Sequence, residues 1–81
     1  MTRRYLTELP PGQAGFLAST PETGASARRL MELGFVPGTR IEVVRVGALG
    51  DPVEVELRGY RICLRRTELS GLEVVVREAA R

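Results

Sequence analysis

The chain has 81 residues, enough for one domain, and carries a formal net charge of only +2. It has no histidine and one cysteine, which excludes an intramolecular disulfide and leaves too few ligands for a zinc or copper site. No apolar run approaches the ~20 residues that cross a bilayer, and no apolar stretch follows the basic N-terminus as it does in a signal peptide. We therefore expect one soluble, cytoplasmic domain over residues 1–81, with no catalytic site, no metal site and no cofactor.

The first half of the chain predicts one strand, one loop and one helix. The pattern of Ala14–Ser19 indicates a strand, and residues 20–24 read as a loop. Residues 25–33 form the one convincing helical pattern, and Gly34 ends it because glycine accepts the left-handed conformation without steric cost. The expected helix has an apolar stripe of Ala27, Leu30, Met31 and Leu33, and a polar side of Arg28, Arg29 and Glu32.

The second half predicts four further strands. Residues 39–46 form the longest of them, and the apolar positions change phase midway, which indicates a β-bulge. The other expected elements are, in order, a loop (47–51, with Leu49 at its tip), a tight hairpin (53–57 and 60–64, turning at Gly59), one helical turn (66–70), a last strand (72–76) and a frayed tail (78–81).

This order of elements decides the fold class. Short strands with a single helix cannot form a doubly wound parallel sheet, which needs a helix between successive strands. We predict a mainly β fold, a small SH3-like barrel of about five strands with one short α-helix after the first strand. Closing the sheet in this way removes exposed strand edges.

The residues that could carry chemistry have simpler structural interpretations. Glu54 and Glu56 alternate along one strand, which is typical of a solvated outer face. Asp51 stands between glycine and proline, where aspartate is a common turn residue. Cys63 lies between two apolar residues of a strand, so we expect a small buried thiol. No active site is predicted from these residues.

All twelve basic residues are arginine. Five of them could form one basic patch: Arg28, Arg29, Arg61, Arg65 and Arg66. Such a patch would suit an RNA-binding SH3-like barrel, but no aromatic residues alternate with these arginines to stack on bases. Glutamates are interspersed with them, so we interpret the arginines as members of ion pairs. The RNA-binding barrel remains an alternative, and a steep loss of nucleic-acid affinity with salt would identify it.

Read together, four segments resemble the FeoA family, the small cytoplasmic accessory proteins of bacterial ferrous-iron transport. The segments are LPPG at 9–12, RRLMELGFVPGT at 28–39, ALGDP at 48–52 and RGYRICLRRTE at 58–68. Each one is weak alone, but the set in this order and spacing is specific, and the resemblance extends from residue 6 to about residue 76. The departure is Cys63, where the family usually has a small residue such as alanine.

This resemblance implies an SH3-like barrel that associates with FeoB, a membrane transporter with a cytoplasmic GTP-binding domain. It implies no resident cofactor, and it leaves open a weak Fe²⁺ ion at a shared interface and a homo-oligomer. A close rival is the SH3-like C-terminal domain of metal-dependent repressors. In those proteins a DNA-binding region and a dimerisation region precede the domain, and this sequence contains neither, so we expect a free-standing domain.

We expect the partner to contact two exposed segments. The first is the polar side of the helix, with Arg28, Arg29 and Glu32, and the second is the loop after the strand at 39–46, with Leu49, Gly50 and Asp51. The reason is their exposure and the special backbone requirements of loops that carry function. Replacing Arg29 or Leu49 is therefore expected to weaken binding of the partner without unfolding the domain.

Overall fold

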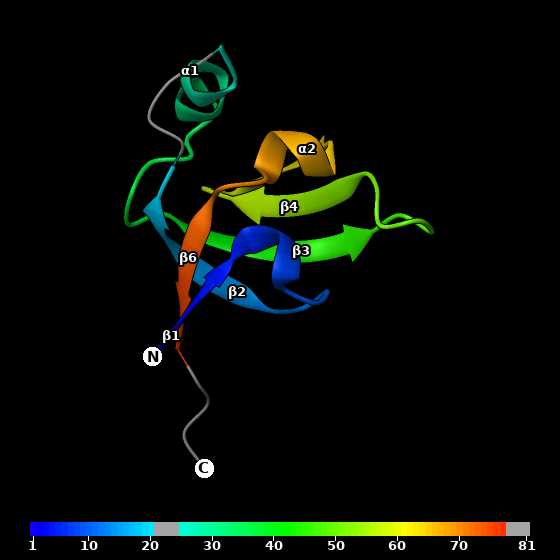
Figure 1. Cartoon of the computed structure of the whole chain (residues 1–81), viewed down its shortest axis with the longest axis horizontal. Helices are drawn as coiled ribbons and strands as arrows, with labels where there is room; N and C mark the ends of the chain where they lie inside the picture. Colours follow the sequence, from blue (N-terminus) through cyan, green and yellow to red (C-terminus); the bar gives the residue numbers. More distant parts are fainter. Residues whose placement is uncertain (21–24, 78–81) are drawn as a thin grey trace.

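The computed structural model describes residues 1–20 and 25–77 (Figure 1). The predicted frayed tail at 78–81 and most of the predicted loop at 20–24 lie outside these residues. The elements are, in chain order, β1 (Thr2–Tyr5), the 3₁₀ turn η1 (Leu6–Glu8), β2 (Ala14–Ser19), α1 (Ala25–Glu32), β3 (Arg40–Val46), β4 (Val53–Leu57), β5 (Tyr60–Leu64), α2 (Arg66–Leu69) and β6 (Glu73–Val76).

The strands of the described residues form a six-stranded antiparallel sheet in the order β1-β6-β2-β3-β4-β5. The sequence analysis missed β1 and therefore counted about five strands. Thr2–Tyr5 has no buried residue and carries two arginines, so it shows no apolar alternation. It becomes a strand because it pairs with β6, from Thr2 opposite Val76 to Tyr5 opposite Glu73, and such a long-range pairing leaves no local signal.

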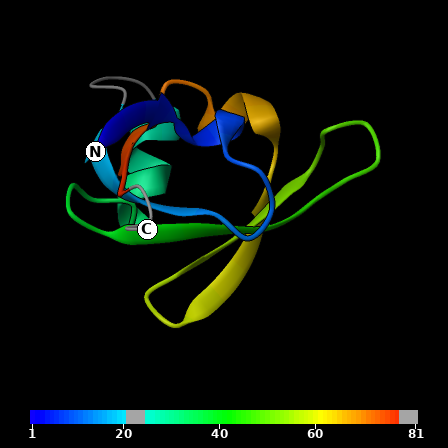
Figure 2. The same ribbon diagram turned by 90° about the horizontal axis from the view of Figure 1, so that it is seen from below.

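The sheet curls around one core, which is aliphatic except for Phe35 (Figure 2). Strand β4 shows the expected alternation, with three buried residues on the inner side and Glu54 and Glu56 on the outer side. The buried apolar residues come from almost every element: Leu6, Leu9, Leu17, Leu30, Phe35, Ile41, Val43, Val53, Val55, Leu57, Leu64, Leu69, Leu72, Val74 and Val76. Burial of this apolar surface is the main favourable term in folding.

The predicted bulge in β3 is confirmed. The register between β3 and β4 shifts between Val43 and Arg45, so that an extra residue of β3 is accommodated there. A bulge bends its strand and increases the local twist, and here it lies just after the residues of β3 that pair with β2. The bulge therefore contributes to the curl that closes the core.

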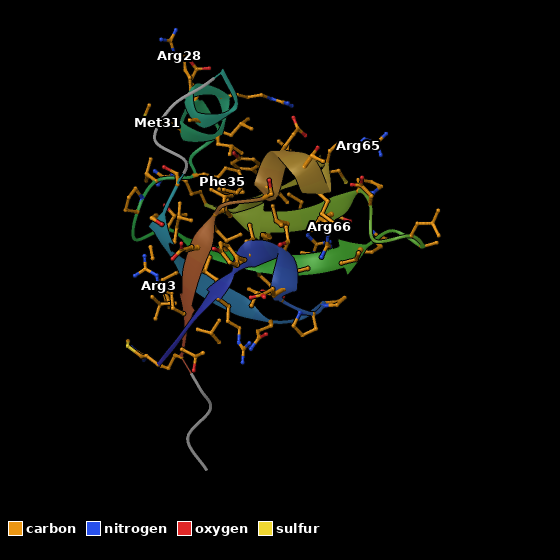
Figure 3. All side chains as sticks on the ribbon, viewed as in Figure 1. Arg3, Arg28, Met31, Phe35, Arg65 and Arg66 are labelled. Carbon is orange, nitrogen blue, oxygen red and sulfur yellow. The ribbon has the colours of Figure 1, made fainter. Side chains whose placement is uncertain are left out.

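The helix α1 ends at Glu32, one residue before the predicted end, and Gly34 then has a φ of +105°. Leu30 is 2% exposed, as expected for the apolar stripe, but Met31 is 59% exposed. The placement of Met31 in the core is thus wrong. Figure 3 shows Met31 at the outside of the helix, whereas Leu30 and Phe35 are buried members of the core.

The expectation of a buried thiol at Cys63 is also wrong, because this cysteine is exposed. Leu64 is buried and Ile62 packs against the core, so the residue between them points to the outer face of β5. The sequence pattern shows which residues alternate, but it does not show that the outer side of β5 has no covering layer.

Packing of α1 on the sheet gives a test with a matched pair of substitutions. We expect Leu30→Ala to lower the free energy of unfolding by about 2–5 kcal/mol, because it removes a buried side chain and leaves a cavity. We expect Met31→Ala, one position along the same helix, to change it by less than about 0.5 kcal/mol. Urea denaturation followed by circular dichroism measures both, and equal costs for the two variants would contradict the observed orientation of α1.

Candidate functional site

The two segments predicted to contact a partner lie at opposite ends of one side of the molecule, with α2 between them (Figure 1). The helix α1 supplies Arg28, Arg29 and Glu32 at one end, and the loop between β3 and β4 supplies Leu49, Gly50 and Asp51 at the other. We call α1, α2 and the loop of residues 47–52 the helix–loop surface. The sequence analysis did not include α2 in this surface.

An ion pair joins α1 to α2. The Arg29 guanidinium donates to the Glu68 carboxylate, and Glu68 also accepts a hydrogen bond of 2.8 Å from the backbone N–H of Arg65. Arg29 is therefore engaged within the chain. Arg28 and Glu32 are exposed and have no ion pair within residues 1–20 and 25–77, and Figure 3 shows Arg28 directed away from the body. Of the three predicted helix residues, Arg28 and Glu32 are thus available to a partner.

The loop of residues 47–52 has a closed backbone. The N–H of Gly47 donates to the carbonyl of Pro52 at 2.9 Å, and the N–H of Gly50 donates to the carbonyl of Gly47 at 2.9 Å. A Cβ on Gly47 would lie 2.2 Å from the carbonyl oxygen of Asp51, so the two ends of the loop meet this closely because residue 47 has no side chain. The loop presents Leu49, which is 96% exposed, at its tip.

Two residues hold this loop against α2. The Asp51 carboxylate accepts a hydrogen bond of 2.8 Å from the N–H of Arg66, the first residue of α2, and lies 3.8 Å from the guanidinium of Arg65. The Arg66 guanidinium donates a hydrogen bond of 2.9 Å to the backbone carbonyl of Thr7 in η1. It also lies 3.5 Å from the backbone carbonyl oxygen of Gly50. Asp51 and Gly50 therefore position the loop. This structural role of Asp51 agrees with its interpretation as a turn residue.

The basic patch considered as an alternative does not form as a free cluster of charge. Arg29 pairs with Glu68, Arg61 pairs with Glu56 at 3.2 Å, and Arg65 faces Asp51. The interpretation of the arginines as members of ion pairs is thus confirmed for these three. Exposed pairs of this kind contribute about 0–1 kcal/mol each, so their effect is to balance charge and position side chains more than to stabilise the fold.

A shallow hollow lies beside the end of α1 and was not foreseen from the sequence. It has a volume of about 440 Å³, and its lining is part apolar and part charged: Met31, Glu32, Leu33, Gly34, Val36, Arg58 and Tyr60. Two of these residues are joined by a hydrogen bond, which the Tyr60 hydroxyl donates to the Leu33 carbonyl. The tight turn after β4 thus packs against the end of α1, a contact between residues far apart in the sequence.

Metal ligands do not gather in the part of the chain that the structure describes. No three His, Cys, Asp or Glu side chains lie close enough together there to hold a metal ion. The expectation that the chain has no cofactor remains a prediction. Among the same residues, no helix has both the length and the apolar character needed to span a membrane.

Comparison with known proteins identifies relatives over nearly the whole chain. A family model described as the FeoA domain matches residues 4–76. The Fe(2+) transport protein A/Fe(2+) transporter FeoB fusion protein of Porphyromonas gingivalis is 35% identical over 69 residues, which is 85% of this chain and 8% of that protein. The chain therefore spans less than a tenth of the length of this relative.

Solved structures agree with this result. The FeoA protein from Chlorobium tepidum is 36% identical, with a TM-score of 0.84 over 96% of this chain and 74% of that one. FeoA of Stenotrophomonas maltophilia, complexed with zinc and described as an SH3 domain protein, is 36% identical, with a TM-score of 0.73 over 89% and 87%. The SH3-like fold class is thus confirmed.

A manganese-dependent transcriptional repressor is also similar in structure. It is 17% identical, with a TM-score of 0.82 over 91% of this chain and 41% of that one. At this identity the likeness concerns the fold alone.

The contact between Asp51 and α2 can be tested by comparing two substitutions. We expect Asp51→Ala to lower the free energy of unfolding by about 1 kcal/mol, because it leaves the first N–H of α2 without its acceptor. We expect Asp51→Asn to cost less than about 0.5 kcal/mol, since the amide oxygen can still accept this hydrogen bond. Thermal unfolding of the two variants measures the difference, and an alanine variant as stable as wild type would show that the contact does not hold α2.

Proposed function

Because the chain belongs to the FeoA family and is thereby linked to ferrous iron transport, we propose that it is a cytoplasmic accessory protein that binds an FeoB-type membrane transporter. The proposed action is protein–protein interaction and not catalysis. The contact surface is the helix–loop surface, with Arg28, Glu32 and Leu49 as the side chains that reach the partner. Arg29, Gly50 and Asp51 position these elements through their contacts with Glu68 and Arg66 of α2.

The observation that carries this proposal is the fusion protein of Porphyromonas gingivalis, in which a region 35% identical to this chain shares a polypeptide with a FeoB transporter. Joining two domains in one chain raises their effective concentration to the millimolar range for a short flexible linker. Such an arrangement is useful where the two domains act on one another. In a protein whose domains are separate chains, the same contact must form by non-covalent binding.

The local structure of the loop supports a role in binding. A fully exposed leucine on a closed loop loses little conformational freedom when it is buried by a partner, because its backbone is already fixed by hydrogen bonds. Burial of an apolar side chain in a partner's pocket is the usual source of a large share of binding energy. Leu49 lies on such a loop, and its exposed apolar side chain is available for burial of this kind.

Binding can be measured directly by isothermal titration calorimetry. The full chain is titrated into the cytoplasmic GTP-binding domain of FeoB from the same organism, first with GDP and then with a GTP analogue. We expect saturable binding, and a difference between the two nucleotides would indicate regulation through linkage. Absence of binding both to this domain and to the full-length transporter in detergent would contradict the proposed function.

The surface is tested by two substitutions in the same titration. We expect Leu49→Ser and Arg28→Glu each to raise the dissociation constant by about tenfold, because the first removes an apolar anchor and the second reverses a free charge. Arg4→Glu, a charge reversal in β1 on another part of the surface, serves as the control and is expected to bind as wild type does. Thermal unfolding should be unchanged in all three, since the residues are exposed. Wild-type affinity in both test variants would show that the partner binds elsewhere.

A further inference from the structure

Strand β5 forms one edge of the sheet, and its first residue, Tyr60, contacts the end of α1. Within the described residues, β4 is the one strand that pairs with β5. Figure 2 shows the β4–β5 hairpin extending from the body, with no other element along the outer side of β5. The opposite edge, β1, has two arginines in four residues, whereas Tyr60–Leu64 has one charged residue, Arg61, and no proline. Exposed edges of this kind are templates for pairing with another strand.

The turn before β5 determines which backbone groups face the open side. Arg58 and Gly59 form a two-residue turn with φ values of 52° and 87°, as in a type I′ hairpin. In such a hairpin the flanking residues, Leu57 and Tyr60, exchange hydrogen bonds with each other, and the bonded pairs then alternate along the ladder. The N–H and C=O groups of Arg61 and Cys63 therefore point away from β4, toward the free edge.

Charges on the outer face of the sheet indicate what the next strand would carry. Two cross-strand rows end at β5: Glu42, Glu56 and Arg61 in one, and Arg45, Glu54 and Cys63 in the other. In the second row, Arg45 pairs with Glu54 at 3.1 Å. In the first row, Arg61 contacts Glu56 on one side, and its other side faces the open edge. An acidic residue on an added strand would complete this row, because opposite charges on neighbouring strands attract.

We propose that the free edge of β5 binds an extended segment of the FeoB-type partner by strand addition, with an acidic side chain of that segment beside Arg61. The backbone groups of Arg61 and Cys63 supply the hydrogen bonds, and the apolar side of the added strand extends the inner face next to Ile62. This inference rests on the proposed function for the identity of the partner. The partner would then bind at two places, the helix–loop surface and the edge of β5. The two places are neighbours in the chain, because β5 is followed by Arg65 and then by α2.

A second copy of the chain fits this edge less well. When two β5 strands pair in antiparallel fashion about Ile62, Arg61 faces Cys63 of the other copy. When they pair about Cys63, Arg61 faces Arg65, and like charges directly opposite one another are destabilising. Tyr60–Leu64 contains no acidic residue, so no register of two β5 strands gives Arg61 a carboxylate from the other β5.

The matched test uses two substitutions at Cys63 in the calorimetric titration with the FeoB cytoplasmic domain. Cys63→Pro removes an N–H that points outward and leaves the ladder to β4 intact, which proline tolerates on an edge strand. Cys63→Ser keeps this N–H. We expect the proline variant to raise the dissociation constant by about tenfold, through loss of one backbone hydrogen bond and its neighbours, and the serine variant to bind as wild type does.

A second pair of variants keeps the test valid if Cys63→Pro does not fold, which thermal unfolding of the free chain reveals. Arg61→Glu is expected to raise the dissociation constant by about tenfold, whereas Arg61→Lys, which keeps the charge, changes it by less than about threefold. The thiol of Cys63 gives a further measurement, since it is the one cysteine of the chain. Saturating partner should slow its alkylation by N-ethylmaleimide, whereas the thiol introduced by Pro11→Cys in a Cys63→Ser background should react at an unchanged rate.

The outcomes separate the two proposals. If wild type binds the partner and both Cys63→Pro and Arg61→Glu bind equally well, the strand-addition proposal is overturned and the proposed function stands. If wild type binds neither the cytoplasmic domain nor the full-length transporter, both are overturned. Sedimentation of the free chain tests whether two copies pair through β5. If the wild-type chain self-associates and Cys63→Pro abolishes this association, the edge binds a second copy and the proposal is overturned.

Discussion

The short helix α2 makes the contacts on which the arrangement of the candidate surface depends. Its four residues and the preceding Arg65 connect to α1 through Glu68, to the loop of residues 47–52 through Asp51, and to η1 through Arg66. Each contact is individually modest, because it is exposed to solvent. Together they join segments from four places in the chain, while Leu69 anchors the helix in the core. A helix of one turn has little stability alone, so it exists here because these partners hold it.

The same contacts explain why charged residues on this surface differ in availability. Arg29 is exposed and Asp51 is half-buried, and both are already engaged by contacts with α2. Their neighbours Arg28 and Leu49 make no such contact with α2, so these two side chains are available to a partner. A partner that binds the helix–loop surface therefore meets a preorganised frame with a few free side chains, which lowers the entropic cost of association.

The curl of the sheet has a second consequence. A barrel that closes completely has no edges, but the described residues form a sheet whose first and last strands, β1 and β5, do not pair with each other. The β1 edge is short and carries arginines, whereas the β5 edge is more apolar and projects from the body. Of the two edges, β5 is therefore the one better suited to pair with an added strand. The two features that we propose to contact a partner, the closed loop with Leu49 and the edge of β5, both adjoin α2.

The amino-acid sequence by itself determined the local elements and the fold class. Period-two alternation identified β4 and β5, the phase change in 39–46 identified the bulge, and Gly34 located the end of α1. These features depend on neighbouring residues, so local patterns contain them. Tertiary structure decided the strand β1, the exposure of Met31 and Cys63, and the contacts of Arg29, Asp51 and Arg66. Each of these depends on a segment distant in the chain, either as a pairing partner or as the layer that does or does not cover a face, and no local pattern records it.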